Sequence, residues 1–154
     1  MSDNDDFAIG PDLLCGGCAA EGVCRLGVKI ADEHDGATRF DVVCPRHWQG
    51  GPAVAHGGWT AAMFDDVLNV AALRSEPRLV TKSLSVQYLR PVPVERPLTA
   101  LARVERHEGR EWTVSARLTL GPHTLATARA ELRTRRPDHY ARAERQLPFP
   151  VNEN

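Results

Sequence analysis

The longest stretch of apolar residues with helical spacing runs from Gly57 to Leu73. Apolar side chains recur there every three or four residues, and most of the remaining positions are apolar as well. A helix that is apolar nearly all round is typically buried inside a fold. Pro77 follows a few residues later, as expected beyond a helix end. This segment is therefore predicted to be one long buried helix.

Segments in which apolar and polar residues alternate indicate strands on both sides of this helix. Two short strands are expected before it, at 28–30 and 38–43, with a hairpin turn at Asp35-Gly36. Cys44–Ala55, with two prolines and two glycines, is expected to be a structured loop. Four longer strands follow the helix, and we expect them to form an antiparallel meander: 83–90, 98–105, 112–120 and 126–133.

The order strand, strand, helix, then four strands predicts an α+β fold in which a curved antiparallel sheet wraps around one long buried helix. This domain is expected to span residues 28–136. Residues 1–27 are interpreted as an N-terminal arm (1–14) and a loop rich in cysteine and glycine, and residues 137–154 as a polar tail.

Composition and charge narrow the range of partners. The chain has 154 residues, 42% of them hydrophobic and 25% charged, with a formal net charge of -1. Neither nucleic acid nor an anionic membrane is therefore an expected partner. The basic run Arg133–Arg136 lacks interleaved aromatic residues and is interpreted as a solvated strand end. The acidic start is unlike a secretory signal, so the cytoplasm is the expected location.

Three cysteines, Cys15, Cys18 and Cys24, crowd the N-terminal region, while Cys44 stands apart. Disulfides are not expected in a cytoplasmic chain. A Cys-x-x-Cys pair with a third cysteine could hold zinc, but no second pair follows to complete four ligands. Reduced thiols without a metal are the preferred interpretation, and a zinc-stabilised protein is the alternative.

The candidate chemistry lies at the start of the predicted helix, where His56-Gly57-Gly58 precedes Asp65. A carboxylate is costly to place in an apolar helix, which suggests that it has a use. The glycines leave backbone N–H donors exposed at the helix start, a suitable arrangement for polarising a carbonyl group. Asp66 points about 100° away from Asp65 on a helix, so Asp65 is preferred. A structural carboxylate bonded to Asn69, one turn on, is the alternative.

These residues resemble the hotdog-fold acyl-coenzyme A thioesterases of the phenylacetate-pathway type. The likeness rests on Gln49–Pro52, the His56-Gly57-Gly58 turn and Asp65, with a second motif at Thr81 and Tyr88–Pro91. The resemblance implies hydrolysis of an acyl-coenzyme A thioester, with no cofactor and no catalytic metal. It also implies a homodimer or homotetramer with the active site between two subunits.

The resemblance further implies roles for individual residues. Asp65 activates water or attacks the thioester, and the N–H groups of Gly57 and Gly58 polarise its carbonyl. Thr81 assists from the neighbouring subunit. Gln49 takes the place of an amide that relatives carry one residue later, and His56 belongs to the same catalytic loop.

Residues outside this set are expected to contact the substrate. Trp59 is expected beside the acyl group, and Lys82 and Arg90 are candidates for the coenzyme A phosphates, since these side chains bind phosphate well. The acyl group itself stays open. The alternative function is a hotdog protein that binds acyl-coenzyme A or a small apolar ligand without hydrolysing it.

Overall fold

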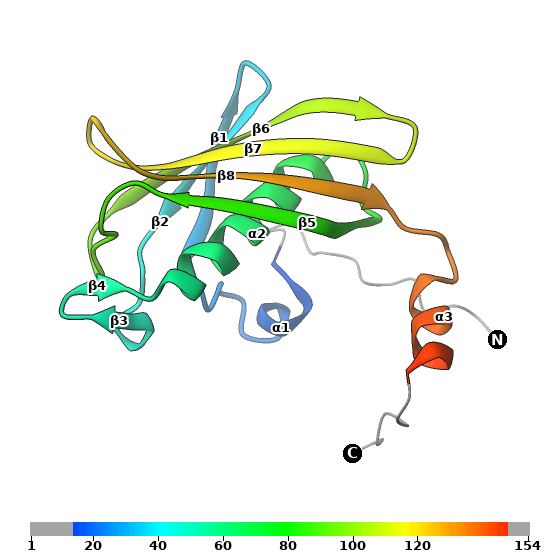
Figure 1. Ribbon diagram of the computed structural model, residues 1–154, viewed down its shortest axis with the longest axis horizontal. Coiled ribbons are helices and arrows are strands. Elements are labelled where there is room, and N and C mark those ends of the chain that lie inside the picture. Colours follow the sequence, from blue (N-terminus) through cyan, green and yellow to red (C-terminus); the bar gives the residue numbers. More distant parts are fainter. Residues whose placement is uncertain (1–13, 148–154) are drawn as a thin grey trace.

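The computed structural model describes residues 14–147 and contains a six-stranded antiparallel sheet with one long helix packed against it (Figure 1). The sheet order is β1-β2-β6-β7-β8-β5. The long helix, α2, spans Gly57–Leu73. The strands of the sheet are β1 (Val28–His34), β2 (Ala37–Val42), β5 (Leu79–Tyr88), β6 (Leu98–Glu108), β7 (Glu111–Leu120) and β8 (His123–Thr134).

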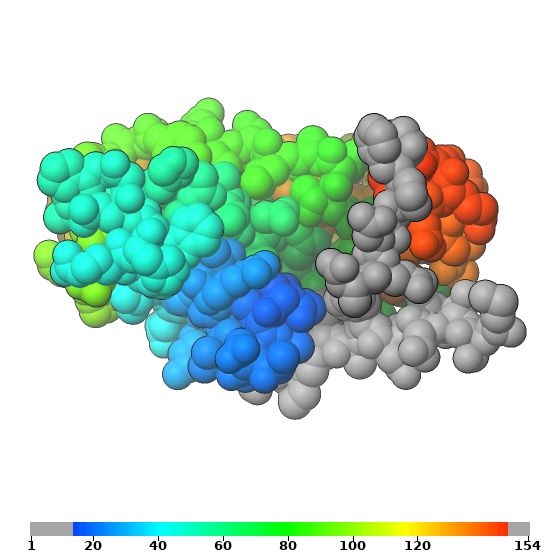
Figure 2. Space-filling view, turned by 90° about the horizontal axis from the view of Figure 1, so that it is seen from below, coloured from blue at the N-terminus to red at the C-terminus, as the bar shows by residue number. Residues whose placement is uncertain are grey.

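Shorter elements surround this core. The helix α1 (Gly16–Ala19) lies on the side of α2 that faces away from the sheet (Figures 1 and 2). A 3-10 turn, η1 (Arg46–Trp48), leads into a small hairpin of β3 (Gln49–Gly51) and β4 (Val54–Ala55) just before α2. The helix α3 (His139–Gln146) follows β8.

The predicted α+β fold is confirmed, and the reason is visible in the packing. One face of α2 is wholly buried, with Met63, Phe64, Val67 and Leu68 inaccessible to solvent. Buried alanines on β6 and β8 leave space for this helix, and they are Ala100, Ala102, Ala126, Ala128 and Ala130. The helix therefore fills the inner side of the sheet.

Two sequence expectations are wrong, and one helix was not predicted. The four late strands do not form one meander, because β5 crosses to the far edge of the sheet and pairs with β8. The segment 44–55, expected to be a loop, contains η1 and the β3–β4 hairpin. The expected polar tail contains α3, a helix of eight residues.

The predicted arm, residues 1–14, lies outside the described residues except for Leu14, and so does the tail beyond residue 147. Within residues 14–147, no helix has both the length and the apolarity to cross a membrane.

Candidate active site

Asp65 on α2, Asn69 one turn later and Thr81 on β5 form a closed hydrogen-bonded cluster. The Thr81 hydroxyl donates to Asp65 Oδ1 at 2.7 Å. Asn69 Nδ2 lies 2.8 Å from Thr81 Oγ1, 2.8 Å from the Asp65 carbonyl oxygen and 3.3 Å from Asp65 Oδ1. The predicted contact between Asp65 and Asn69 is therefore present, and it orients the carboxylate by fixing one of its oxygens.

The cluster opens into a cavity of about 370 Å³ between α2, β1, β5 and the N-terminal segment. Most of the other lining side chains are apolar, and they are Leu14, Val28, Ile30, Phe40, Val70, Leu73, Leu79, Val80 and Tyr140. An apolar cavity with a few convergent polar groups is the usual form of a small-molecule site. A hydrophobic group can therefore lie against the sheet with its polar end at Asp65.

Asp66 also lines this cavity, although sequence reasoning set it aside. Burial raises its pKa to about 6, the Asp65 carboxylate adds to the rise, and the Arg25 guanidinium opposes it. The Cys24 thiol donates weakly to Asp66 Oδ2 at 3.9 Å. Two carboxylates therefore share the cavity, and only Asp65 is held by a hydroxyl and an amide.

The helix start is built by His56, which accepts a hydrogen bond from Gly58 N–H on its Nδ1 at 2.9 Å. His56 is thus an N-cap, and this contact occupies one of the two N–H donors expected to polarise a carbonyl. The N–H of Gly57 forms no hydrogen bond to another described residue. The Tyr88 hydroxyl donates to Gly57 O at 2.8 Å and holds the turn against the end of β5. Gly57 N–H is therefore the available donor.

The β3–β4 hairpin packs closely on this helix start. A Cβ at Gly50 would lie 2.8 Å from His56 Cα, so only glycine fits there. The side chain of Gln49 accepts from Ala53 N–H at 3.2 Å and closes the hairpin. Within one chain, Gln49 therefore supports the loop and does not reach Asp65.

Three expected substrate contacts lie elsewhere. Trp59 is wholly buried, and its indole donates to Leu26 O at 3.1 Å, so it belongs to the core. Lys82 projects from the outer face of the sheet towards Glu111, 3.6 Å away. Arg90 donates to Thr124 O at 2.5 Å beside the β7–β8 turn.

The resemblance implied that Thr81 assists from a neighbouring subunit. Thr81 binds Asp65 of its own chain, because the bulge between Thr81 and Ser83 and the pairing of β5 with β8 bring it to α2.

The cysteines give no support to the zinc alternative. Among residues 14–147, no group of three or more histidine, cysteine or acidic side chains is arranged to hold a metal ion. Burial raises the pKa of Cys15, with further rises from Cys18 and Asp66, and burial raises that of Cys44 to about 11. All four thiols are free.

Sequence reasoning gave no role in the chemistry to four residues of the site. Asn69 was considered only as a structural partner, although its spacing of four residues from Asp65 was the available signal. Asp66 was set aside in favour of Asp65, and Tyr88 was noted only as part of the second motif. Tyr140 gave no signal, because its place depends on how distant segments pack.

Comparison with known proteins shows what this chain is similar to. Residues 53–127 match the Thioesterase superfamily. The chain is 33% identical over 88 residues to acyl-coenzyme A thioesterase THEM4 of Rattus norvegicus, a match that covers 53% of this chain and 37% of that protein. The segment 53–127 contains α2, the strands β5, β6 and β7, and the start of β8.

Two solved structures have a similar fold. One is a thioesterase superfamily protein, 30% identical, with a TM-score of 0.63 over 68% of this chain and 54% of the other. The second, from Ralstonia eutropha JMP134, is described as a putative thioesterase related to phenylacetic acid degradation; it is 26% identical, with a TM-score of 0.67 over 75% of this chain and 89% of the other. The chain thus spans about a third to a half of the length of two of these relatives. Its fold is that of hotdog proteins, and residues 53–127 are similar to the thioesterase superfamily.

Proposed function

We propose that this protein hydrolyses an acyl-coenzyme A thioester to a free acid and coenzyme A. The observation that carries the proposal is the Asp65–Asn69–Thr81 cluster at the polar end of an apolar cavity. Asp65 either takes a proton from the attacking water or attacks the thioester carbon itself. Thr81 and Asn69 hold the carboxylate in the orientation that either route requires.

The same carbonyl needs a donor for the negative charge that develops on its oxygen, and Gly57 N–H is the available group. Gly57 and Asp65 are eight residues apart on α2, a separation of about 12 Å along the helix axis. A reacting carbonyl must lie about 3 Å from each partner. One chain therefore cannot supply both groups to one substrate, which supports a site shared by two copies.

We infer that a second copy completes the site through the edge strand β5. Thr81 lies near one end of β5 and Tyr88 at the other, and each binds a part of α2, namely Asp65 and Gly57. Antiparallel pairing of two β5 strands, centred between residues 84 and 85, would bring Thr81 of one copy beside Tyr88 of the other. Each Asp65 would then face the Gly57 of the second copy.

The surface of β5 is consistent with such pairing. An unpaired edge strand of ten residues is a ready template for another strand. It carries the partly exposed Leu84 and Val86, and Tyr88 and Leu89 at its end are 55% and 53% exposed. A homodimer or a pair of dimers, in the cytoplasm, is the assembly and location that we propose. In this arrangement the second subunit supplies the glycine turn, and Thr81 stays with its own Asp65.

The test is thiol release from a panel of aryl and straight-chain acyl-coenzyme A esters by three variants. Asp65→Asn keeps the oxygen that Thr81 binds and removes the charge. We expect its turnover rate to fall by about a hundred- to ten-thousand-fold. Gly57→Pro removes the N–H at the first helical position, where proline is tolerated, and His56 has the extended backbone (ψ 136°) that a following proline prefers. We expect the turnover rate of Gly57→Pro to fall by about a hundred- to a thousand-fold.

Gly57→Ala is the matched control. It keeps the N–H, and its Cβ would lie at an ordinary 3.6 Å from the Tyr88 ring. Its activity should stay within a few-fold of the wild type. A folded wild-type protein that releases no thiol from any ester would refute the hydrolase. Retained affinity for acyl-coenzyme A in that case, unchanged by Asp65→Asn, would support the non-catalytic binding protein instead.

A further inference from the structure

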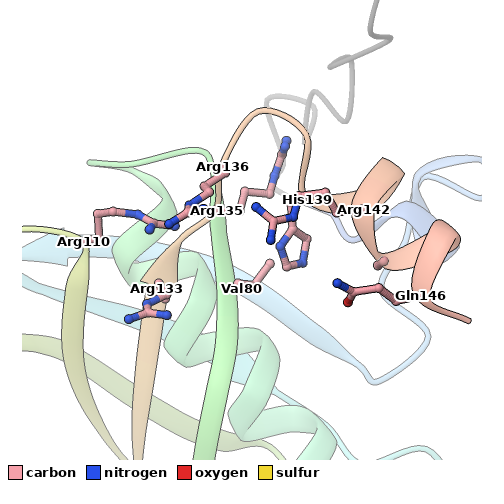
Figure 3. Close-up of a pocket in the computed structure, with 9 residues that line it drawn as sticks. Val80, Arg110, Arg133, Arg135, Arg136, His139, Arg142 and Gln146 are labelled. Carbon is pink, nitrogen blue, oxygen red and sulfur yellow. The ribbon is translucent and has the colours of Figure 1, made fainter.

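A second cavity, of about 380 Å³, is lined by five arginines and a histidine (Figure 3). The side chains come from three separate places in the sequence: the β6–β7 turn, the end of β8, and α3. They are Arg110, Arg133, Arg135, Arg136, His139 and Arg142. The sequence suggested that Arg133–Arg136 form a solvated strand end. In the structure these arginines line a cavity, and Arg135 is only 7% exposed.

The arginines of this cavity differ in how their charge is balanced. Arg133 pairs with Glu111 at 2.5 Å, and the guanidinium of Arg135 lies over the Tyr140 ring, 5.1 Å from its centroid. Arg136 and Arg142 are exposed and form no ion pair with another residue between 14 and 147. The lining includes no acidic side chain. The cavity therefore attracts a multiply charged anion.

This arginine cavity adjoins the cavity that contains Asp65. Val80 on β5 lines both. The helix α3 also borders both, since Tyr140 lines the cavity of Asp65 while His139 and Arg142 line the arginine cavity. Thr81, which binds Asp65, directly follows Val80 in the chain. The two cavities therefore meet at this end of β5.

We propose that the arginine cavity binds the phosphate groups of the coenzyme A substrate, with Arg136 and Arg142 as the principal contacts. The inference rests on the proposed function, because it treats the acyl-binding and phosphate-binding cavities as parts of one site. Arginine binds phosphate oxygens in a bidentate manner.

Within one chain, the two earlier candidates for phosphate binding make other contacts. Lys82 faces Glu111, and Arg90 is bonded to a backbone carbonyl beside the β7–β8 turn. Neither lines the cavity of Asp65 or the arginine cavity.

The experiment measures the dissociation constants of coenzyme A and of pantetheine, which has no phosphate, by titration calorimetry. It compares the wild type with the double variant Arg136→Ala/Arg142→Ala and with Arg103→Ala, an exposed arginine on β6 that lines neither cavity. We expect coenzyme A to bind about ten- to a hundredfold more weakly to the double variant, since a hydrogen bond to a charged group contributes about that much. Pantetheine affinity should not change, and Arg103→Ala should bind both ligands as the wild type does.

Turnover separates this inference from the proposed function. With the double variant, KM for an acyl-coenzyme A ester should rise by the same factor, while hydrolysis of the matching acyl-pantetheine ester should be unaffected. No turnover of either ester by the wild type would contradict the hydrolase, and the binding measurement would still test the arginine cavity. Coenzyme A affinity within twofold of the wild type in the double variant, or an equal loss for pantetheine, would overturn the phosphate assignment.

Discussion

Replacing Asp66 by asparagine should make the protein more stable at neutral pH. The folded protein holds this carboxyl group in the apolar cavity next to Asp65, and burial raises its pKa from an ordinary 3.8 to about 6. Ionising it in the folded state is therefore unfavourable. Asparagine has nearly the same shape and carries no charge, so the variant removes this unfavourable ionisation and keeps the packing.

The sign and size follow from proton linkage. Between pH 4 and 6 the folded protein binds more protons at this site than the unfolded chain does, so the free energy of unfolding falls as the pH rises through that interval. The difference between 3.8 and about 6 corresponds to about 3 kcal/mol at 1.36 kcal/mol per pH unit. Above pH 6 this stability has been lost completely, and Asp66→Asn should recover it.

Urea denaturation at several pH values between 4 and 8 provides the assay. The variant should exceed the wild type by about 3 kcal/mol at pH 8, with a midpoint of thermal unfolding about 6–12 °C higher, and the difference should shrink towards pH 4. Asp41→Asn, at an exposed position on β2, is the control and should show no such trend. A gain for Asp66→Asn that is the same at pH 4 and pH 8, or a loss at pH 8, would refute the reasoning.

Two further predictions concern packing. Gly50→Ala should destabilise the protein by about 1–3 kcal/mol, because its Cβ would lie 2.8 Å from His56 Cα. Gly51→Ala is the control and should change the urea midpoint little, because the space around Gly51 is open. Equal changes of the midpoint in the two variants would argue against the close approach at Gly50. Trp59→Phe should lower the free energy of unfolding by about 2–3 kcal/mol, because it removes the bond to Leu26 O and leaves a gap in the core. A changed KM with unchanged stability would instead restore Trp59 as a substrate contact.

The parts of the fold that local patterns determine were predictable from the sequence. The helix Gly57–Leu73 is present at the expected bounds, because its apolar residues follow one helical period without interruption. The position of β5 was not predictable, since the choice between pairing with β6 and with β8 depends on the whole sheet. The helix α3 was missed because its residues are mostly polar and its place depends on contacts with distant segments.

The candidate site divides in the same way. The spacing of His56, Gly57 and Asp65 could be recognised because all three belong to one helix and the turn before it. The burial of Trp59 could not be recognised, because a tryptophan at that position suits a pocket wall and a core equally well. Only the folded chain brings Leu26 O within hydrogen-bonding distance of its indole. The arginine cavity combines residues from three segments, and only the folded chain brings them together.

The eight-residue separation of Gly57 and Asp65 on one rigid helix has a genetic consequence if two copies share each site. Every dimer then has two sites, and each site takes its acid from one copy and its glycine turn from the other. A copy that lacks the acid and a copy that lacks the Gly57 donor would each be inactive alone. Mixed dimers of the two would retain one complete site, so random pairing of equal amounts restores about a quarter of the sites. Two defective alleles of this gene could therefore complement each other.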